Sequence, residues 1–196
     1  MKFASYRYNQ SDKPRFGFKR DKYIVDVVKC ANWLNEKKGD AIFLDIPSSL
    51  KECLKNWSIN YELLNELDAL ITNEDIIETS KIDKPIANLE SDLELLAPVP
   101  NPQSFRDFYA FEQHVRSARK LRGLDMHPDW FNIPIFYYSN SVALFGHREK
   151  INYPRGTSEL DFELEFAAIL ADGGANISSE SATNYIAGYT LSLIHI

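Results

Sequence analysis

A row of carboxylates in the second half of the chain could bind a metal ion. Asp161, Glu163 and Glu165 occupy alternate positions, and the positions around them are apolar: Leu160, Phe162, Leu164 and Phe166. This period of two predicts a β-strand with a buried apolar face and an acidic face opposite. Carboxylates about 7 Å apart on one face repel one another, and a hard divalent cation would offset that repulsion. A solvated edge strand whose charges deter aggregation is the alternative. This stretch alone leaves both interpretations open.

A second set of polar residues falls on a helix predicted over residues 104–121, ended by Gly123. Ser104 and Asp107 have the spacing of a capping box, with Asp in place of the usual Glu. The helix has one apolar stripe: Phe108, Phe111, Val115, Ala118 and Leu121. His114 follows Asp107 by two helical turns, so both would lie on a similar face. On the helix alone, a cap and a surface histidine explain these residues.

Aromatic residues then cluster in a strand region over residues 128–138. Tyr137 and Tyr138 fit half-buried strand positions, and their polar tips would equally suit the wall of a small-molecule pocket. A further short strand is expected over residues 142–145.

The elements that must position these residues follow from the rest of the chain. Residues 1–92 are expected to form a small N-terminal domain that begins with a hairpin. Its predicted strands are residues 2–7, 15–19 and 22–27, and its predicted helices are residues 28–37 (ended by Gly39), 48–57 and 58–71. Residues 72–92 are polar and irregular, and they mark the expected domain boundary. A second domain is expected over residues 93–190.

Composition limits the classes of partner. The net charge of −6 comes from 28 acidic and 22 basic residues, and with no basic patch it argues against a nucleic-acid partner. No apolar run approaches the roughly 20 residues that cross a bilayer. Cys30 and Cys53 lack metal-site spacing and are expected to be free thiols in a cytoplasmic protein.

Three segments taken together resemble the fumarylacetoacetate hydrolase family. They are residues 107–114, with the pattern D-F-Y-x-x-x-x-H, the aromatic residues 128–137, and residues 160–165, which carry E-x-E. The similarity extends over roughly residues 93–189. It implies an α+β protein, in which a small N-terminal α/β domain precedes the start of an incomplete mixed β-sheet-roll catalytic domain.

The resemblance also implies roles for individual residues. Asp107, Glu163 and Glu165 would supply three of four carboxylates that hold Mg²⁺ or Ca²⁺, with Mn²⁺ as a further candidate. His114 would activate water, because an unperturbed imidazole titrates near neutral pH. The residues implied to contact substrate are Tyr109, Tyr137 and Arg122. Asp161 would remain outside the metal site.

The implied reaction is metal-dependent hydrolysis of a C–C bond in a small β-dicarbonyl substrate, similar to fumarylacetoacetate or an acylpyruvate. Hydration, isomerisation or decarboxylation of a 2-oxo acid is the alternative within the superfamily. A non-catalytic binding or structural domain is the alternative outside it. The resemblance further implies a homodimer for the full-length protein, while the charge and the lack of a long apolar run exclude nucleic acid and a membrane from the expected partners.

The end of the sequence departs from the family pattern. After Thr190 the resemblance implies an Asn-Asp-Trp-Ser-like strand that carries the fourth metal-binding Asp. Residues 191–196 instead read Leu-Ser-Leu-Ile-His-Ile and are expected to be a non-native tail, with His195 as no ligand. The chain as given is therefore expected to be inactive, because a metal ligand and much of the catalytic domain are missing.

Overall fold

The computed structural model describes residues 1–39 and 41–195, so Ile196, the last residue of the expected tail, lies outside the described residues. The chain divides into two compact units, Met1–Pro100 together with Phe145–Ile196, and Asn101–Leu144. The described residues mix helices and strands, as the α+β prediction requires. The domain boundaries at residues 92 and 190 stay predictions.

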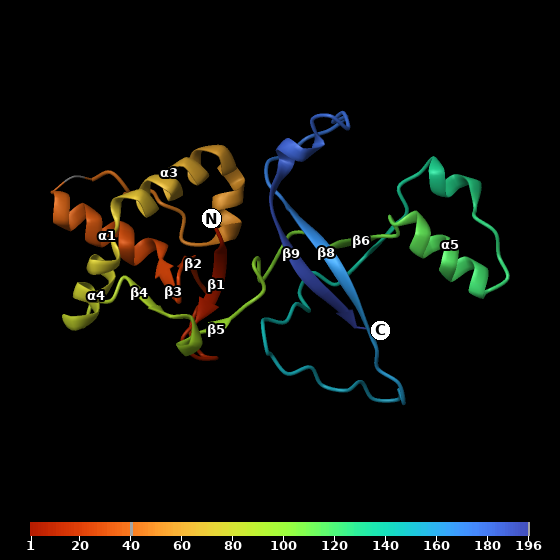
Figure 1. Ribbon diagram of the computed structural model, residues 1–196, viewed down its shortest axis with the longest axis horizontal. Coiled ribbons are helices and arrows are strands. Elements are labelled where there is room, and N and C mark those ends of the chain that lie inside the picture. The colour runs from red at the N-terminus through yellow and green to blue at the C-terminus, as the bar shows by residue number, and fades with distance from the viewer. Residues whose placement is uncertain (40, 196) are drawn as a thin grey trace. The chain divides into compact units, whose positions relative to one another are not determined.

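A five-stranded antiparallel sheet begins the first unit, with the strand order β4-β3-β2-β1-β5 (Figure 1). Its strands are β1 (Phe3–Arg7), β2 (Arg15–Arg20), β3 (Tyr23–Asp26), β4 (Ala87–Leu89) and β5 (Glu94–Leu95). The predicted hairpin is confirmed, since Phe3 pairs with Phe18 and Tyr6 pairs with Arg15. The short 3-10 helix η2 (Glu90–Asp92) joins β4 to β5.

Four helices pack with this sheet. They are α1 (Val27–Lys38), α2 (Leu50–Cys53), α3 (Trp57–Leu70) and α4 (Asn73–Lys81), with the 3-10 helix η1 (Leu54–Asn56) between α2 and α3. Gly39 ends α1 with φ 72°, as predicted, because a left-handed residue closes the helix with least strain at glycine. Helix α3 supplies buried Leu64 and Leu67, three residues apart on one face, to a core that includes Phe16, Phe18, Val25, Val27 and Leu34.

Residues 72–92 are not irregular, which corrects the prediction. Thr72 accepts a hydrogen bond from the Asp75 amide while Asp75 accepts one from the Thr72 amide, so a capping box starts α4. Ile76 on this helix is buried in the core. The acidic composition of the segment hid a local signal that fixes the start of the helix.

Asp75 links this cap to α1, because its carboxylate also accepts a hydrogen bond from Lys37 Nζ at 2.6 Å. Burial tends to raise the pKa of Asp75, but the bonds from Lys37 and Thr72 outweigh it and hold the pKa below its ordinary 3.8. A lowered carboxyl pKa stabilises the fold above that ordinary value. The contribution is lost as the pH falls from 3.8 through the lower folded-state value.

Replacing Asp75 with asparagine is expected to remove this pH dependence. The loss at neutral pH should be below about 1 kcal/mol from the ion pair, because the Lys37 side chain is half exposed to screening water. Urea unfolding at pH 7 and pH 3 measures both values. A stability difference between parent and Asp75→Asn that is the same at both pH values would refute the assignment.

The cysteines are free thiols, as predicted, and both are buried in the core. Burial raises the pKa of Cys30 and of Cys53 to about 12, which leaves both thiols protonated at neutral pH. Neither is therefore an activated nucleophile. No helix in the described ranges has the length and apolar character needed to span a membrane.

Buried Asp26 is the polar centre of the N-terminal sheet. Its Oδ2 accepts hydrogen bonds from Tyr6 Oη at 2.6 Å and from Arg15 Nε at 2.5 Å. Its Oδ1 accepts from the Lys29 amide at 2.8 Å and so caps α1. Burial and the Asp26 charge raise the pKa of Tyr6, so the phenol stays neutral and donates. One carboxylate thus joins three strands to the first helix.

The second unit contains β6 (Arg106–Phe108), α5 (Glu112–Leu121), η3 (Pro128–Phe131) and β7 (Phe136–Tyr138). β6 and β7 form an antiparallel pair, with a ring contact between Phe108 and Phe136. The helix predicted to start at Ser104 therefore starts eight residues later, at Glu112. Strand pairing, which places Tyr137 opposite Asp107 and Phe136 opposite Phe108, outweighs the capping signal.

The long hairpin of β8 (Phe162–Leu170) and β9 (Ile186–His195) belongs to the first unit, and η4 (Ala182–Tyr185) precedes β9. The strand expected over residues 142–145 is absent from this described stretch, which has no regular structure. Residues 191–195 continue β9, and Leu191 pairs with Phe166.

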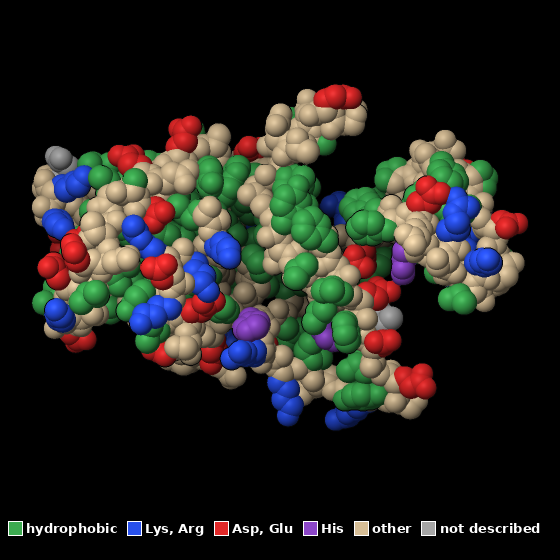
Figure 2. All heavy atoms as spheres, in the orientation of Figure 1, with side chains coloured by type: hydrophobic (Ala, Val, Ile, Leu, Met, Phe, Trp, Pro, Cys, Tyr) green, Lys and Arg blue, Asp and Glu red, His purple; other side chains and the backbone are tan. Residues whose placement is uncertain are grey.

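The two faces of β8 are covered differently from the prediction. The apolar side chains are exposed, with 57% of Phe162, 65% of Leu164 and 62% of Phe166 accessible, while Glu163 and Glu165 are half-buried. On β9 the exposed apolar residues are Tyr189, Leu191 and Leu193. Figure 2 shows hydrophobic side chains on the visible surface over β8 and β9. The alternation is confirmed, but its apolar face is not a core face in this chain.

Candidate metal and substrate site

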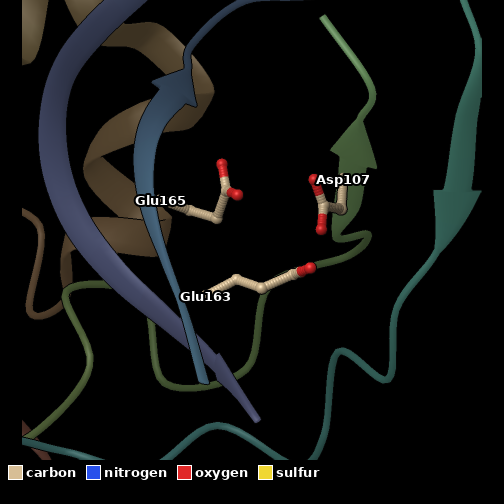
Figure 3. A group of neighbouring side chains, drawn as sticks. All are labelled: Asp107, Glu163 and Glu165. Atoms are coloured by element: carbon tan, nitrogen blue, oxygen red, sulfur yellow. The ribbon is translucent and has the colours of Figure 1, made fainter. Parts of the chain in front are cut away.

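Glu163 and Glu165 form an acidic pair on one face of β8. Alternation along the strand points both side chains to the same side, as Figure 3 shows. Each offers a carboxylate oxygen, and these oxygens lie within 4.8 Å of each other. The antiparallel partner β9 fixes the pair, with Ile194 opposite Glu163 and Ser192 opposite Glu165. This spacing lets two oxygens contact one cation.

Asp107 lies in β6 of the other unit, directly opposite Tyr137 in β7 (Figure 3). The predicted capping role is wrong, because α5 begins after Phe111 and has no side-chain cap. Strand pairing fixes the backbone on both sides of Asp107 and leaves its half-buried carboxylate free of a capping bond to α5. It also brings together two residues that the sequence selected for different roles, one for metal and one for substrate.

His114 and Tyr109 also meet within the second unit. His114 lies in the first turn of α5, and its ring contacts the Tyr109 ring edge-on, with centroids 5.8 Å apart. The Tyr109 amide donates to the Ile135 carbonyl at 3.1 Å, and the Trp130 indole N–H donates to the Tyr109 carbonyl at 2.8 Å. Tyr109 is therefore held at both backbone groups, beside an exposed imidazole.

Trp130 is the residue that sequence reasoning missed. It belongs to the aromatic segment, but nothing in its spacing predicted that its N–H would fix the backbone of Tyr109. An indole N–H that is partly buried needs an acceptor, and this requirement is the one signal that pointed to a polar contact.

Arg122 is the C-cap residue of α5. Its Nε donates to the Ala118 carbonyl within the same helix at 3.2 Å, and the side chain is exposed. A role in binding substrate stays a prediction for this residue.

The donor atoms of the three predicted ligands suit a hard cation. Asp107, Glu163 and Glu165 offer only carboxylate oxygens, which are the ligands that Mg²⁺ and Ca²⁺ prefer. The group contains neither sulfur nor imidazole, the donors that a zinc or copper site favours.

The match with known proteins decides the family. Residues 103–193 match the family described as "Fumarylacetoacetate (FAA) hydrolase C-terminal". They belong to the fumarylacetoacetate hydrolase family. This segment of the family contains every residue singled out above, from Asp107 to Glu165.

Individual relatives span different parts of the chain. Oxaloacetate tautomerase fahd2, mitochondrial, of Xenopus laevis is 27% identical over 198 residues, which cover 97% of this chain and 50% of that protein. Oxaloacetate tautomerase YisK of Bacillus subtilis is 26% identical and covers 87% of this chain and 52% of that protein. Fumarylacetoacetase of Arabidopsis thaliana is 31% identical over 107 residues, 44% of this chain and 25% of that protein. The chain thus spans about half the length of the first two relatives.

Proposed function

We propose that this member of the fumarylacetoacetate hydrolase family acts on a small 2-oxo acid or β-dicarbonyl substrate with a divalent cation, Mg²⁺, Ca²⁺ or Mn²⁺. Asp107, Glu163 and Glu165 would hold the cation. When bound, it would supply Lewis-acid stabilisation of the negative charge that develops on a substrate oxygen. The observation that carries the proposal is the pair of half-buried glutamates whose oxygens approach within 4.8 Å on one strand face.

The residues of the second unit would handle substrate and protons. The His114 imidazole would take a proton from the substrate carbon or from water, because its ring is accessible and a neutral imidazole nitrogen can accept a proton. Tyr109, fixed through its amide and carbonyl, would hold the substrate beside that ring. Tyr137 would contribute a further phenol, and Arg122 would pair with a substrate carboxylate.

Keto–enol tautomerisation of an oxaloacetate-like 2-oxo acid is the first candidate reaction. The relatives that cover 97% and 87% of this chain are both named oxaloacetate tautomerases, so their similarity includes the N-terminal sheet as well as the site. Proton transfer between carbon and oxygen needs only a base and stabilisation of the enolate charge. His114 and the acidic group would supply these without a water molecule as reactant.

Hydrolysis of a C–C bond is the second candidate, favoured by the similarity to fumarylacetoacetases over 107 residues. In that case His114 would activate water, which would attack one carbonyl while the carbon of the breaking bond leaves as an enolate. A homodimer and a cytoplasmic location remain part of the proposal.

An assay with two substrates separates the candidates. The purified full-length protein is incubated with Mg²⁺ and oxaloacetate, and the loss of enol absorbance is measured. In a second reaction it is incubated with Mg²⁺ and an acylpyruvate, and the cleavage products are measured. We expect Mg²⁺-dependent acceleration of the first reaction, abolished by chelation of the metal. Cleavage of the acylpyruvate alone would favour the hydrolase. Acceleration of neither reaction by any of the three cations would refute the proposed function.

A further inference from the structure

An open groove of about 990 Å³ lies beside β5, the edge strand of the N-terminal sheet, and all of its lining belongs to the first unit. Residues 89–91 and 93–96 line one part of the groove, and the loop of residues 147–150 lines another. Arg7 and Lys22 also line it. In Figure 2, Lys, Arg and His side chains gather around the position that β5 has in Figure 1. The groove shares no residue with the acidic site.

The acidic residues of the groove are already paired. Glu90 forms an ion pair with Lys19, a residue that does not line the groove. Glu94 and Glu149 both pair with Arg7, at 2.8 Å and 3.6 Å. These contacts neutralise much of the negative charge that the lining carries.

The basic residues are in excess. Lys22, Arg148 and Lys150 line the groove and form no ion pair within residues 1–39 and 41–195. His147 adds an imidazole next to them. In a chain of net charge −6, three unpaired cations around one concave surface form a local exception. Their N–H groups are suited to bind the oxygens of an anion.

The loop that carries two of these cations is fixed to the sheet. The His147 amide donates to the Leu95 carbonyl at 3.0 Å. Gly146 packs so closely that a Cβ atom there would lie 2.2 Å from the Leu95 oxygen, so glycine is required. Arg148 adopts the left-handed conformation at φ 61°, which an L-residue with a long side chain rarely takes. A strained residue that its surroundings hold in place is typical of a binding position.

We propose that this groove binds a small polyanion through its carboxylate or phosphate oxygens. Lys22, Arg148 and Lys150 would donate the hydrogen bonds, with the planar guanidinium able to contact two oxygens at once. A ligand with at least two negative charges fits better than a monoanion, because the three glutamates of the lining still repel an approaching anion and several cations must offset that repulsion.

Calorimetric titration at low salt tests the proposal, with inorganic phosphate and citrate as separate probes. We expect saturable binding of at least one probe. Tighter binding of phosphate would indicate a phosphate ligand, and tighter binding of citrate would indicate a carboxylate ligand. Arg148→Asn and Lys150→Gln should each weaken binding roughly threefold to fivefold, the range of one exposed ion pair. Asparagine is chosen at residue 148 because it tolerates the left-handed conformation, so the loop keeps its shape.

Two further variants make the test specific. Lys38→Gln removes an exposed lysine that does not line the groove, and it should leave binding unchanged. Glu149→Gln should tighten binding, because it removes a negative charge while its amide oxygen can still accept the hydrogen bond from the Gly146 amide. Absence of saturable binding for both probes, or equal affinities for Arg148→Asn, Lys150→Gln and Lys38→Gln, would overturn the proposal.

Discussion

Asp26→Ala is expected to lower the free energy of unfolding by roughly 3–4 kcal/mol, the loss typical when one partner of a buried charged network is removed. The carboxylate is 1% exposed and accepts from Tyr6, Arg15 and the Lys29 amide. Its loss strands a fully buried phenol and a partly buried guanidinium, and it removes the cap of α1. Equilibrium unfolding in urea, followed by circular dichroism, measures the change.

Two other variants show whether the network is the cause. Tyr6→Phe removes one hydrogen bond and should lower the unfolding free energy by about 1 kcal/mol. Asp45→Ala removes an exposed aspartate and should change it by less than about 0.5 kcal/mol. The assignment fails if Asp26→Ala destabilises the protein no more than Asp45→Ala does. A loss in Asp26→Ala with an unchanged Tyr6→Phe would place the effect in the Arg15 ion pair and the helix cap.

Glu163→Gln is expected to produce the largest functional loss. It keeps the shape of the side chain but removes one anionic oxygen from the acidic pair on β8. Affinity for Mg²⁺ should fall at least roughly tenfold to a hundredfold, since even residues that only orient metal ligands carry effects of that size. Metal-dependent turnover should fall in parallel. Titration with Mg²⁺ and the tautomerisation assay give the two values.

Asp161→Asn is the matched control for this variant. Asp161 precedes β8 in the same acidic run, is exposed, and accepts a hydrogen bond from the neighbouring Phe162 amide. Neutralising Asp161 removes one negative charge from the same segment and leaves the carboxylates of Glu163 and Glu165 unchanged. Mg²⁺ affinity that drops equally in both variants would mean that general negative charge attracts the cation. Unchanged affinity in both would remove Glu163 from the metal site.

Local sequence signals predicted most of the N-terminal sheet and its helices. The hairpin, the end of α1 at Gly39 and the core position of Leu64 all follow from turn residues, left-handed glycine and a helical stripe, which act over a few residues. The capping box of Thr72 and Asp75 is a signal of the same kind, and it was hidden by the charged composition around it. Short-range chemistry therefore predicted much of the structure that buries the shared core, and α4 is the exception because its capping signal was overlooked.

The residues of the candidate site were chosen from the sequence, and the structure differs from the prediction in the element that carries one of them. Asp107 was expected at a helix start because Ser104 has capping spacing, whereas cross-strand pairing with Tyr137 places it in β6. Such pairing joins residues thirty positions apart, which no local pattern encodes. The roles of all the site residues remain predictions: Asp107, Glu163, Glu165, His114, Tyr109, Tyr137 and Arg122.

The alternation of β8 illustrates a different limit. A period of two states that the faces differ, but which face is covered depends on what packs against the strand. In this chain the covering falls on the side of Glu163 and Glu165, and the phenylalanine and leucine side stays open. A sequence pattern cannot supply that information, because it comes from parts of the chain that lie elsewhere.

The β8–β9 hairpin therefore has two chemically different faces, one apolar and one acidic. Its apolar side chains are exposed, and alternation along the strand directs the acidic side chains to the opposite face. If a protein segment, a detergent or a dye covers the phenylalanine side chains, the carboxylates of Glu163 and Glu165 remain on the opposite face. A substitution on the apolar face therefore leaves the side chains of Glu163 and Glu165 in place, and a substitution of either glutamate leaves the apolar face in place.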